Sequence, residues 1–298
     1  MNTKFKNQSL GDKIFIILVY VFLSIAGLAV LYPLIYIVSA SFSDPQAVMT
    51  GEVVLWPVRV SLKGYQAVFK NPKIMTGFLN SFIYLFLGTA LNLVMTMLCA
   101  YPLSRKEFKH RNKIAALFVF TMYFSGGLVP TYMVVNKLGL IDTIWAMIIP
   151  SAMSTYNMII CRTYMINSIP DEMYEAAQVD GCSPFRYLTR IVTPLCKPIL
   201  AVLTLYYGVA KWNSYFDAML YIKKQALQPL TIIMREILIL NQVDPTMVSD
   251  AKAASEMAGL TALLKYSTIV VASVPVLILY PFVQKHLVKG VMVGAVKG

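Results

Sequence analysis

The sequence predicts an all-α membrane protein with six transmembrane helices, and three observations lead to this fold class. Hydrophobic residues make up 58% of the 298 residues, whereas charged residues make up 13%, about half the fraction typical of soluble domains. The apolar residues form long blocks instead of following the spacing of a single core. Because these blocks lack the strict alternation of barrel strands, helices are the expected spanning elements.

Six segments are long enough to cross a bilayer, which takes about 20 mainly apolar residues in a helix. We expect them to form a single transmembrane domain over residues 1–298. The first segment follows a basic N-terminus, as in a signal peptide, but it is too long, and Tyr32-Pro33 stands where a small-residue cleavage site is expected. It is therefore expected to be retained. The expected spans are 14–40, 77–101, 114–134, 142–164, 198–222 and 262–284.

The short loop at 102–113 predicts the orientation of the chain, because Lys and Arg in short loops mark the cytoplasmic side. Its sequence contains SRKEFKHRNK, with five Lys and Arg residues. With six spans, both termini and segment 165–197 then also lie in the cytoplasm, and loops 41–76 and 223–261 lie outside. This placement accounts for the formal charge of +12, so no nucleic-acid partner is expected.

Segment 165–197 is polar and contains the start and stop signals of two short helices. Ser168 and Asp171 have capping-box spacing, and Pro170 falls in the first turn of the predicted helix. Gly181, after Asp180, is expected to end that helix. Ser183-Pro184 is expected to start a second helix that ends at Pro194. Both helices are too short and too polar to enter the membrane.

The first of these helices presents small side chains at helical spacing. Ile169, Met173, Ala176 and Ala177 are expected to share one face. Small residues on a face let another protein approach closely, and Glu175 beside them offers a carboxylate for an ion pair. The segment is therefore expected to be a docking surface, the alternative being a helix pair that only completes the fold.

Segment 165–197 also carries a family motif. Glu175-Ala176-Ala177, Gly181, Ile191 and Pro194 match the EAA motif of bacterial ABC importer permeases, E-A-A-x3-G-x9-I-x-L-P. The sequence departs from the motif at Thr193, which replaces leucine and is expected to weaken local packing slightly. Residues 80–108 and 211–222 resemble the second and fifth spans of carbohydrate importer permeases. The whole chain resembles MalG-like sugar permease subunits, and residues 124–150 resemble the LplC/YtcP-type branch, which is linked to complex oligosaccharides.

The resemblance implies a type I ABC importer permease fold with a cytoplasmic coupling helix, located in the bacterial cytoplasmic membrane among its lipids. It implies import of sugars, expected to be oligosaccharides, by a chain that is not itself an enzyme. The implied partners are a MalF-like sister permease, an extracytoplasmic solute-binding protein on the outside loops, and an ATPase dimer that binds ATP and Mg. The residues implied for ATPase coupling are Glu175, Ala176, Ala177, Asp180 and Gly181.

Polar and aromatic residues inside two predicted spans are candidates for the sugar pathway. Ionisable groups are costly to bury in a membrane, and aromatic rings and amides suit the faces and hydroxyls of sugars. For the fifth span, the alternative to a pathway role is anchoring at the membrane interface together with structural ion pairs of Lys211 and Asp217. For the second span, the alternative is hydrogen bonding to neighbouring helices. The candidates are Asn80 and Tyr84 in the second span and Lys211, Trp212, Asn213 and Tyr215 in the fifth.

Motifs for other chemistry are missing from the sequence. It contains no G-x4-G-K-[ST] loop for ATP and no convergent catalytic set. Its four cysteines form no C-x-x-C pair, so no metal site or bound cofactor is expected. Two alternative functions remain for the chain, an ion-coupled secondary transporter and a polytopic membrane enzyme. The first needs charge relays or broken helices at the midplane, for which Lys211 and Asp217 alone are slight support.

Overall fold

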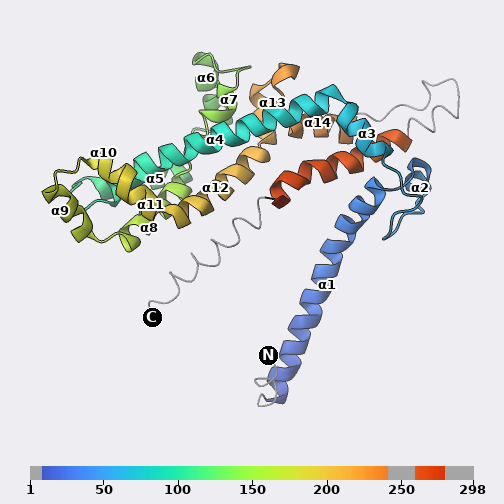
Figure 1. Cartoon of the computed structure of the whole chain (residues 1–298), viewed down its shortest axis with the longest axis horizontal. Helices are drawn as coiled ribbons and strands as arrows, with labels where there is room; N and C mark the ends of the chain where they lie inside the picture. The colour runs from blue at the N-terminus through green and yellow to red at the C-terminus, as the bar shows by residue number, and fades with distance from the viewer. Residues whose placement is uncertain (1–8, 241–258, 279–298) are drawn as a thin grey trace. The chain divides into compact units, whose positions relative to one another are not determined.

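The computed structural model describes residues 9–240 and 259–278, and every regular element in these ranges is helical. The chain divides into two compact units. The first unit comprises Met1–Asn71 and Glu236–Ala272, and the second comprises Pro72–Arg235 and Ser273–Gly298. Figure 1 labels the helices along the chain. The end of the last predicted span, 279–284, lies outside the described residues.

The first unit is built on a long apolar helix, α1 (Leu10–Ser41), which contains the predicted span 14–40. Ser9 caps its start by accepting a hydrogen bond from the Asp12 N–H. The other helices of this unit are α2 (Pro45–Met49), α3 (Lys63–Lys70), the π-helix η3 (Glu236–Leu240) and the part of helix Gly259–Ile278 that ends at Ala272. Its core is formed by Ala40, Ala47, Val48, Val53 and Leu263.

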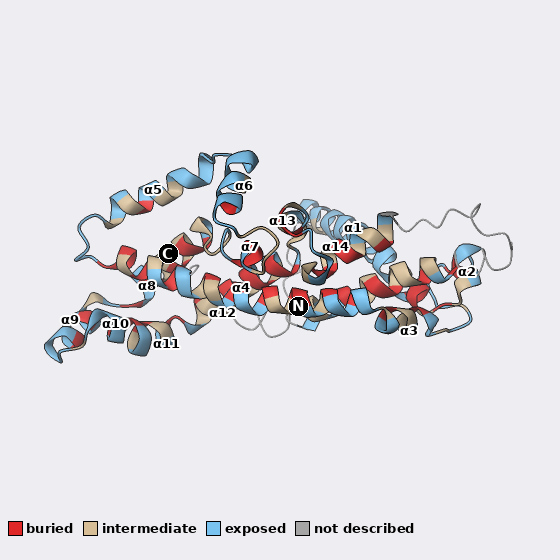
Figure 2. Cartoon of the chain, turned by 90° about the horizontal axis from the view of Figure 1, so that it is seen from above, coloured by how far each residue is buried: buried red, intermediate tan, exposed pale blue. Residues whose placement is uncertain are grey.

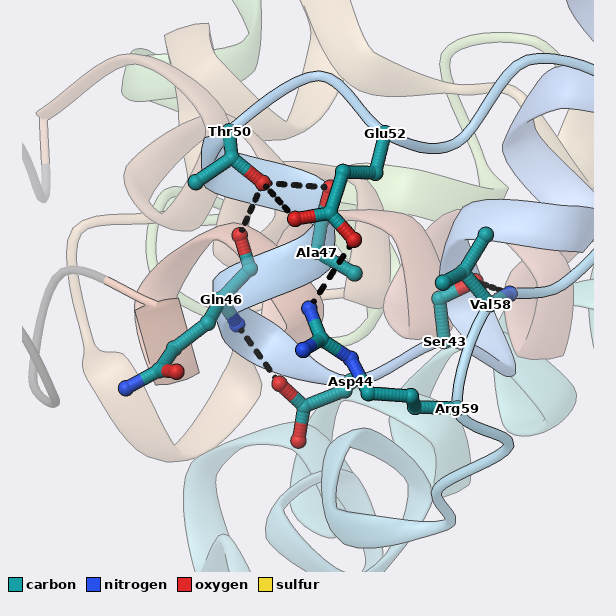
Figure 3. Close-up of polar contacts among 8 residues, drawn as sticks. All are labelled: Ser43, Asp44, Gln46, Ala47, Thr50, Glu52, Val58 and Arg59. Carbon is teal, nitrogen blue, oxygen red and sulfur yellow. Dashed lines mark hydrogen bonds and ion pairs between the residues drawn. The ribbon is translucent and has the colours of Figure 1, made fainter.

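The loop after α1 is held by a compact polar network (Figure 3). Asp44 caps α2 by accepting from the Gln46 N–H at 3.0 Å. The Ser43 hydroxyl accepts from the Val58 N–H at 3.0 Å, and Glu52 pairs with Arg59 at 3.1 Å. These contacts fold residues 52–61 back along the end of α1, so this predicted outside loop has a defined conformation.

The second unit is organised around α4 (Pro72–Ser104), which contains the predicted span 77–101. Helices α8 (Thr155–Ser168) and α12 (Lys197–Trp212) pack along it. Gly88 of α4 permits close approach of α12, since a Cβ there would lie 2.8 Å from the Cε of Lys211. Figure 2 shows the buried residues concentrated on α4, α8 and α12, whereas α5 (Arg111–Tyr123) is mostly exposed.

Three of the predicted spans are not continuous helices, which corrects the sequence analysis. The 114–134 segment forms α5 and α6 (Leu128–Lys137), whose axes differ by 112°. The 142–164 segment forms α7 (Trp145–Ile148) and the start of α8, and the 198–222 segment forms most of α12 and then α13 (Tyr215–Tyr221). Three described helices are long and apolar enough to cross a membrane, or five if bent pairs are counted. The count of six remains a prediction.

Polar side chains of α4 fix the segment that follows α13. This segment contains the short 3-10 helix η2 (Gln225–Leu227) and α14 (Leu230–Arg235). The Asn80 amide donates to the Ala226 and Gln228 carbonyls at 2.8 and 3.0 Å. The Tyr84 hydroxyl donates to the Leu227 carbonyl at 2.7 Å. Asn80 and Tyr84 therefore bond carbonyls of η2 and of Gln228, the residue that follows it, which gives these acceptors partners.

Candidate functional site

The 165–197 segment forms a helix–turn–helix at one end of α4 (Figure 1). Helix α9 (Asp171–Val179) is followed by α10 (Pro184–Tyr187). Ser168 is the last residue of α8, and the N-cap of α9 is Pro170, so the predicted Ser168 capping box is wrong. Pro170 takes an extended conformation that starts the helix without a side-chain cap. The predicted start at Ser183-Pro184 is confirmed, because the Ser183 hydroxyl accepts from the Arg186 N–H.

The turn between α9 and α10 is a Schellman motif centred on Gly181. The Cys182 N–H donates to the Ala177 carbonyl at 2.9 Å, and the Gly181 N–H donates to the Gln178 carbonyl at 3.0 Å. Gly181 has φ of +71°, a conformation that favours glycine. The predicted end of the helix at Asp180-Gly181 is confirmed, and the turn has a single defined geometry.

The second helix ends at Leu195, one residue after its predicted end at Pro194. It changes into a π-helical turn, η1 (Leu188–Val192), and then into α11 (Thr193–Leu195). The wider turn precedes Pro194, whose ring and missing N–H disfavour a regular α-helix there. The Thr193 hydroxyl donates to the Leu188 carbonyl at 2.8 Å, so the departure from the motif's leucine adds a backbone contact.

The two faces of α9 differ from the sequence prediction. Tyr174 and Ala177 are buried, whereas Met173 and Ala176 are exposed, so the four predicted residues do not share a face. Ala177 therefore packs in the interior of the second unit, and its predicted part in ATPase coupling stays a prediction. The larger Tyr174 side chain decides which stripe faces inward. The exposed coupling candidates are Glu175, Ala176, Asp180 and Gly181.

Two apolar side chains near the turn in sequence are strongly exposed. Val179 is 89% exposed and Phe185 is 68% exposed, on either side of Gly181. Together with Ala176 and Glu175, they form a small protruding surface with one carboxylate, which we call the turn surface. Exposed apolar residues grouped in this way are typical of a protein interaction site.

Arg105, which the sequence analysis did not single out, anchors this helix–turn–helix. Its guanidinium carbon lies 4.1 Å from the centre of the Tyr174 ring and 5.8 Å from that of Tyr187. Lys106 beside it forms an ion pair with Asp171, which holds the pKa of that carboxyl below its usual value. The loop after α4 thus contacts α9 and α10 directly. The only sequence signal in this loop is its run of Lys and Arg residues, and we interpreted that run as a marker of the cytoplasmic side.

A cavity of about 250 Å³ lies among α4, α8 and α12, and we call it the polar cavity after the polar side chains among its lining residues. Lys211 reaches it from the last turn of α12 and is 5% exposed. Its ammonium donates to the Met147 carbonyl at 2.8 Å and to the Ser151 hydroxyl at 2.6 Å. The lining offers amide, hydroxyl and carboxylate groups suited to a hydroxyl-rich ligand. The other polar side chains of the lining are Asn92, Ser154, Asn157, Tyr206, Tyr207, Ser214 and Asp217.

The six pathway candidates are not brought together in this cavity. Lys211 lines it, whereas Asn80 and Tyr84 bond residues 226–228. The lining residues Tyr206 and Tyr207 were missed, because tyrosines in an apolar run gave no separate signal. Tyr207 accepts the Ser154 N–H at 3.1 Å and bonds the Thr96 hydroxyl at 2.7 Å, so it joins α12 to both neighbouring helices.

The remaining three candidates point elsewhere. Trp212 is buried with its ring 5.3 Å from that of Phe82, measured between ring centres. Asn213 is exposed at the end of α12 and donates to the Val209 carbonyl of the same helix. The Tyr215 hydroxyl contacts the Met219 sulfur at 3.1 Å. These contacts are structural in kind.

Trp212 and Asn213 are neighbours in sequence, but alanine substitutions at the two positions are expected to have different effects on stability. Trp212→Ala removes a buried ring and should destabilise the second unit by about 3–5 kcal/mol. Asn213→Ala removes an exposed amide and should leave thermal unfolding unchanged. The measurement is thermal unfolding of the purified chain, with Trp212→Phe as a control that retains an aromatic ring. Equal destabilisation by the two alanine variants would contradict this placement.

Metal binding has no support in the described part of the chain. Within residues 9–240 and 259–278, no three His, Cys, Asp or Glu side chains are grouped closely enough to hold a metal ion. The four cysteines are free thiols.

Comparison with known proteins gives consistent matches along the chain. The family described as "Binding-protein-dependent transport system inner membrane component" matches residues 98–293. The chain is 37% identical to the polygalacturonan/rhamnogalacturonan transport system permease protein YtcP of Bacillus subtilis (strain 168), over 96% of this chain and 99% of YtcP. It is 36% identical to protein LplC of the same organism, over 97% and 96% of the two chains.

A solved structure matches in three dimensions as well. It is the crystal structure of a bacterial ABC transporter involved in the import of the acidic polysaccharide alginate. The matching chain is 32% identical in sequence, with a TM-score of 0.86, over 93% of this chain and 98% of that chain. The fold of this chain is therefore found in a solved transporter.

Proposed function

The chain belongs to the family of binding-protein-dependent transport system inner membrane components, and from this premise we propose that it is the transmembrane subunit of an ATP-driven importer of oligosaccharides. The family is the membrane permease component of ABC importers and is not catalytic; the ATPase is a separate subunit. The predicted family and all-α permease fold are confirmed by these matches.

The observation that carries the proposal is the rigid turn surface at Gly181. Val179 and Phe185 offer apolar contact area beside the Glu175 carboxylate, on a turn fixed by two backbone hydrogen bonds. An ATPase subunit that docks there can move α9, and α9 is linked through Tyr174 and Arg105 to the end of α4. When the ATPase dimer closes on ATP and Mg, its movement is thereby transmitted to the helices that line the polar cavity.

The substrate is proposed from the cavity and from the relatives together. One relative is named for polygalacturonan and rhamnogalacturonan transport, and the matching structure for alginate import. The cavity of this chain offers amides and tyrosine hydroxyls for sugar hydroxyls, and a lysine that suits an acidic sugar. A MalF-like sister permease completes the pathway, and a solute-binding protein delivers the sugar at the outside loops.

The proposal is tested by transport in proteoliposomes that contain the complex purified through this chain and its solute-binding protein. Uptake of labelled oligogalacturonate is expected to require ATP on the ATPase side. An unlabelled neutral oligosaccharide of equal length serves as the competitor control. Uptake that follows an ion gradient and ignores ATP would identify an ion-coupled secondary transporter instead.

The orientation of the chain is tested by single cysteines in a cysteine-free background. Val60 is 73% exposed in the loop after α1, and Phe108 is 36% exposed in the basic loop. An impermeant thiol reagent added outside whole cells is expected to label position 60 and to label position 108 only after permeabilisation. Labelling of both positions from outside would overturn the placement of the basic loop in the cytoplasm.

A further inference from the structure

A second cavity, of about 220 Å³, lies at the end of the second unit that carries the helix–turn–helix. Its wall is formed by the end of α4 and the loop that follows, by the first residue of α5, by the last turns of α8 and by α9. No proposed step of transport uses this cavity. Its lining contains Tyr101, Ser104, Arg105, Lys106, Arg111, Arg162, Met165, Ile166, Ile169, Asp171 and Val192.

The charge of this cavity is strongly unbalanced. Arg105, Lys106, Arg111 and Arg162 face it, against the single carboxylate of Asp171. Asp171 is engaged in the ion pair with Lys106, so its charge is already largely neutralised. Three guanidinium groups from three segments of the chain therefore line a cavity that has only one carboxylate, that of Asp171, among its lining residues.

Arg105 provides an independent sign that a partner belongs there. The residue is 8% exposed, and its Nε and Nη2 atoms are buried without a hydrogen bond. The nearest carboxylate oxygens, on Glu107 and Asp171, lie 3.5 and 3.9 Å from these atoms. A buried donor without an acceptor is costly, and a negative charge in the cavity would stabilise the Arg105 guanidinium electrostatically.

Arg162 is held in place on the opposite wall. Its Nε donates to the Leu103 carbonyl at 2.8 Å, and its Nη2 donates to the Asn112 amide oxygen at 3.1 Å. A guanidinium fixed in this way loses little freedom on binding a ligand. Fixed arginines from different segments are the arrangement that recognises tetrahedral phosphate oxygens.

The position of the cavity indicates the source of the phosphate. The predicted spans 77–101 and 142–164 end just before Ser104 and Met165, so the cavity lies at the expected level of the cytoplasmic headgroups. Ile166 in the lining is 46% exposed, which leaves an apolar rim on a basic site. Basic pockets between helices at this level bind the headgroups of anionic lipids. We propose that this cavity binds the phosphate group of an anionic phospholipid headgroup.

Occupancy of the cavity has a consequence for the helix–turn–helix. Arg105, which would meet the phosphate, also stacks on Tyr174 and Tyr187. A bound headgroup would therefore hold Arg105 in the position that anchors α9 and α10. Lipid binding goes beyond the proposed transport function and is measured without transport, so either proposal can fail alone.

The test measures lipid binding to the complex purified through this chain, in detergent, by native mass spectrometry. The probes are phosphatidylglycerol and phosphatidylcholine with identical acyl chains. Phosphatidylglycerol is expected to remain bound at one site in preference to phosphatidylcholine. Arg111→Gln is expected to weaken this binding about tenfold, since it removes a charge-assisted hydrogen bond. Lys113→Gln, which removes the same charge two residues away but outside the lining, is the matched control and should change binding less than about twofold.

Three results would overturn the proposal. Equal loss in Arg111→Gln and Lys113→Gln would mean general surface attraction and no defined site. Both lipids carry a phosphodiester, so equal retention of the two would mean that the cavity does not select the net negative charge of an anionic headgroup. Displacement of phosphatidylglycerol by millimolar inorganic phosphate, with equal thermal stabilisation by the ion alone, would keep the phosphate site but assign it to a free anion.

Discussion

Replacing Gly181 with valine is expected to abolish ATP-driven transport while the chain still enters the membrane. A β-branched residue at φ of +71° is strained by about 1–3 kcal/mol. Nothing lies within 4 Å of the position a Cβ would take, so the effect comes from the backbone and not from a clash. The turn would relax to another conformation, and a cost of this size at a docking surface weakens ATPase binding about 5–150-fold.

The matched control for this variant is Gly181→Asn, because asparagine tolerates positive φ far better than valine. The two variants add side chains of similar size to the same open space. The measurement is uptake and ATP hydrolysis in proteoliposomes, with the ATPase content of the purified complex determined on a gel. If valine retains full coupling and subunit content, the turn at Gly181 is not where the ATPase docks.

The all-α fold was predictable because composition and long apolar blocks report on the environment of each segment. Helix breaks were harder to predict, because hydropathy over a window is insensitive to a short non-helical stretch. The break between α5 and α6 contains Gly126-Gly127, with Gly127 at φ of +87°. This glycine pair was visible in the sequence, but an apolar run on both sides outweighed it. The break at Asn213-Ser214 coincides with the polar cluster that was interpreted as a pathway.

The turn of the helix–turn–helix was predictable from the sequence, but which faces of its helices are buried was not. Gly181 and Ser183 act through local backbone rules, which a sequence contains in full. The inward direction of Ala177 depends on Tyr174 and Tyr187, whose rings meet at 5.0 Å between centres, and on Arg105 from a distant part of the chain. Helical periodicity identifies stripes of residues, but the partner that covers a stripe comes from tertiary structure. The packing of Trp212 was unpredictable for the same reason, because its partners Phe78 and Phe82 lie on another helix.

Lys211→Met is expected to reduce transport at least as severely as the change at Gly181. The variant keeps the length of the side chain but leaves the Met147 carbonyl and the Ser151 hydroxyl without their donor. Each polar group left unsatisfied costs about 1–3 kcal/mol. The first contact joins α12 to α7 and the second joins it to the stretch between α7 and α8, so their loss frees one wall of the polar cavity. Removal of the ammonium also removes the one cation that lines this cavity among the described residues.

Two further variants separate the structural contribution of Lys211 from its charge. Ser151→Ala removes one acceptor and keeps the charge, so it should lower stability slightly and leave uptake of an acidic oligosaccharide nearly unchanged. Lys211→Arg keeps the charge, but its planar head must fit beside Gly88, where a Cβ would already lie 2.8 Å from the Lys211 Cε. Arginine is therefore expected to disturb the contact of α12 with α4 and to rescue uptake only in part. The measurements are uptake in proteoliposomes and thermal unfolding of each complex. Normal uptake by Lys211→Met with unchanged unfolding would show that the cavity around Lys211 is neither a pathway nor a structural joint, and the sugar would then pass along the sister subunit.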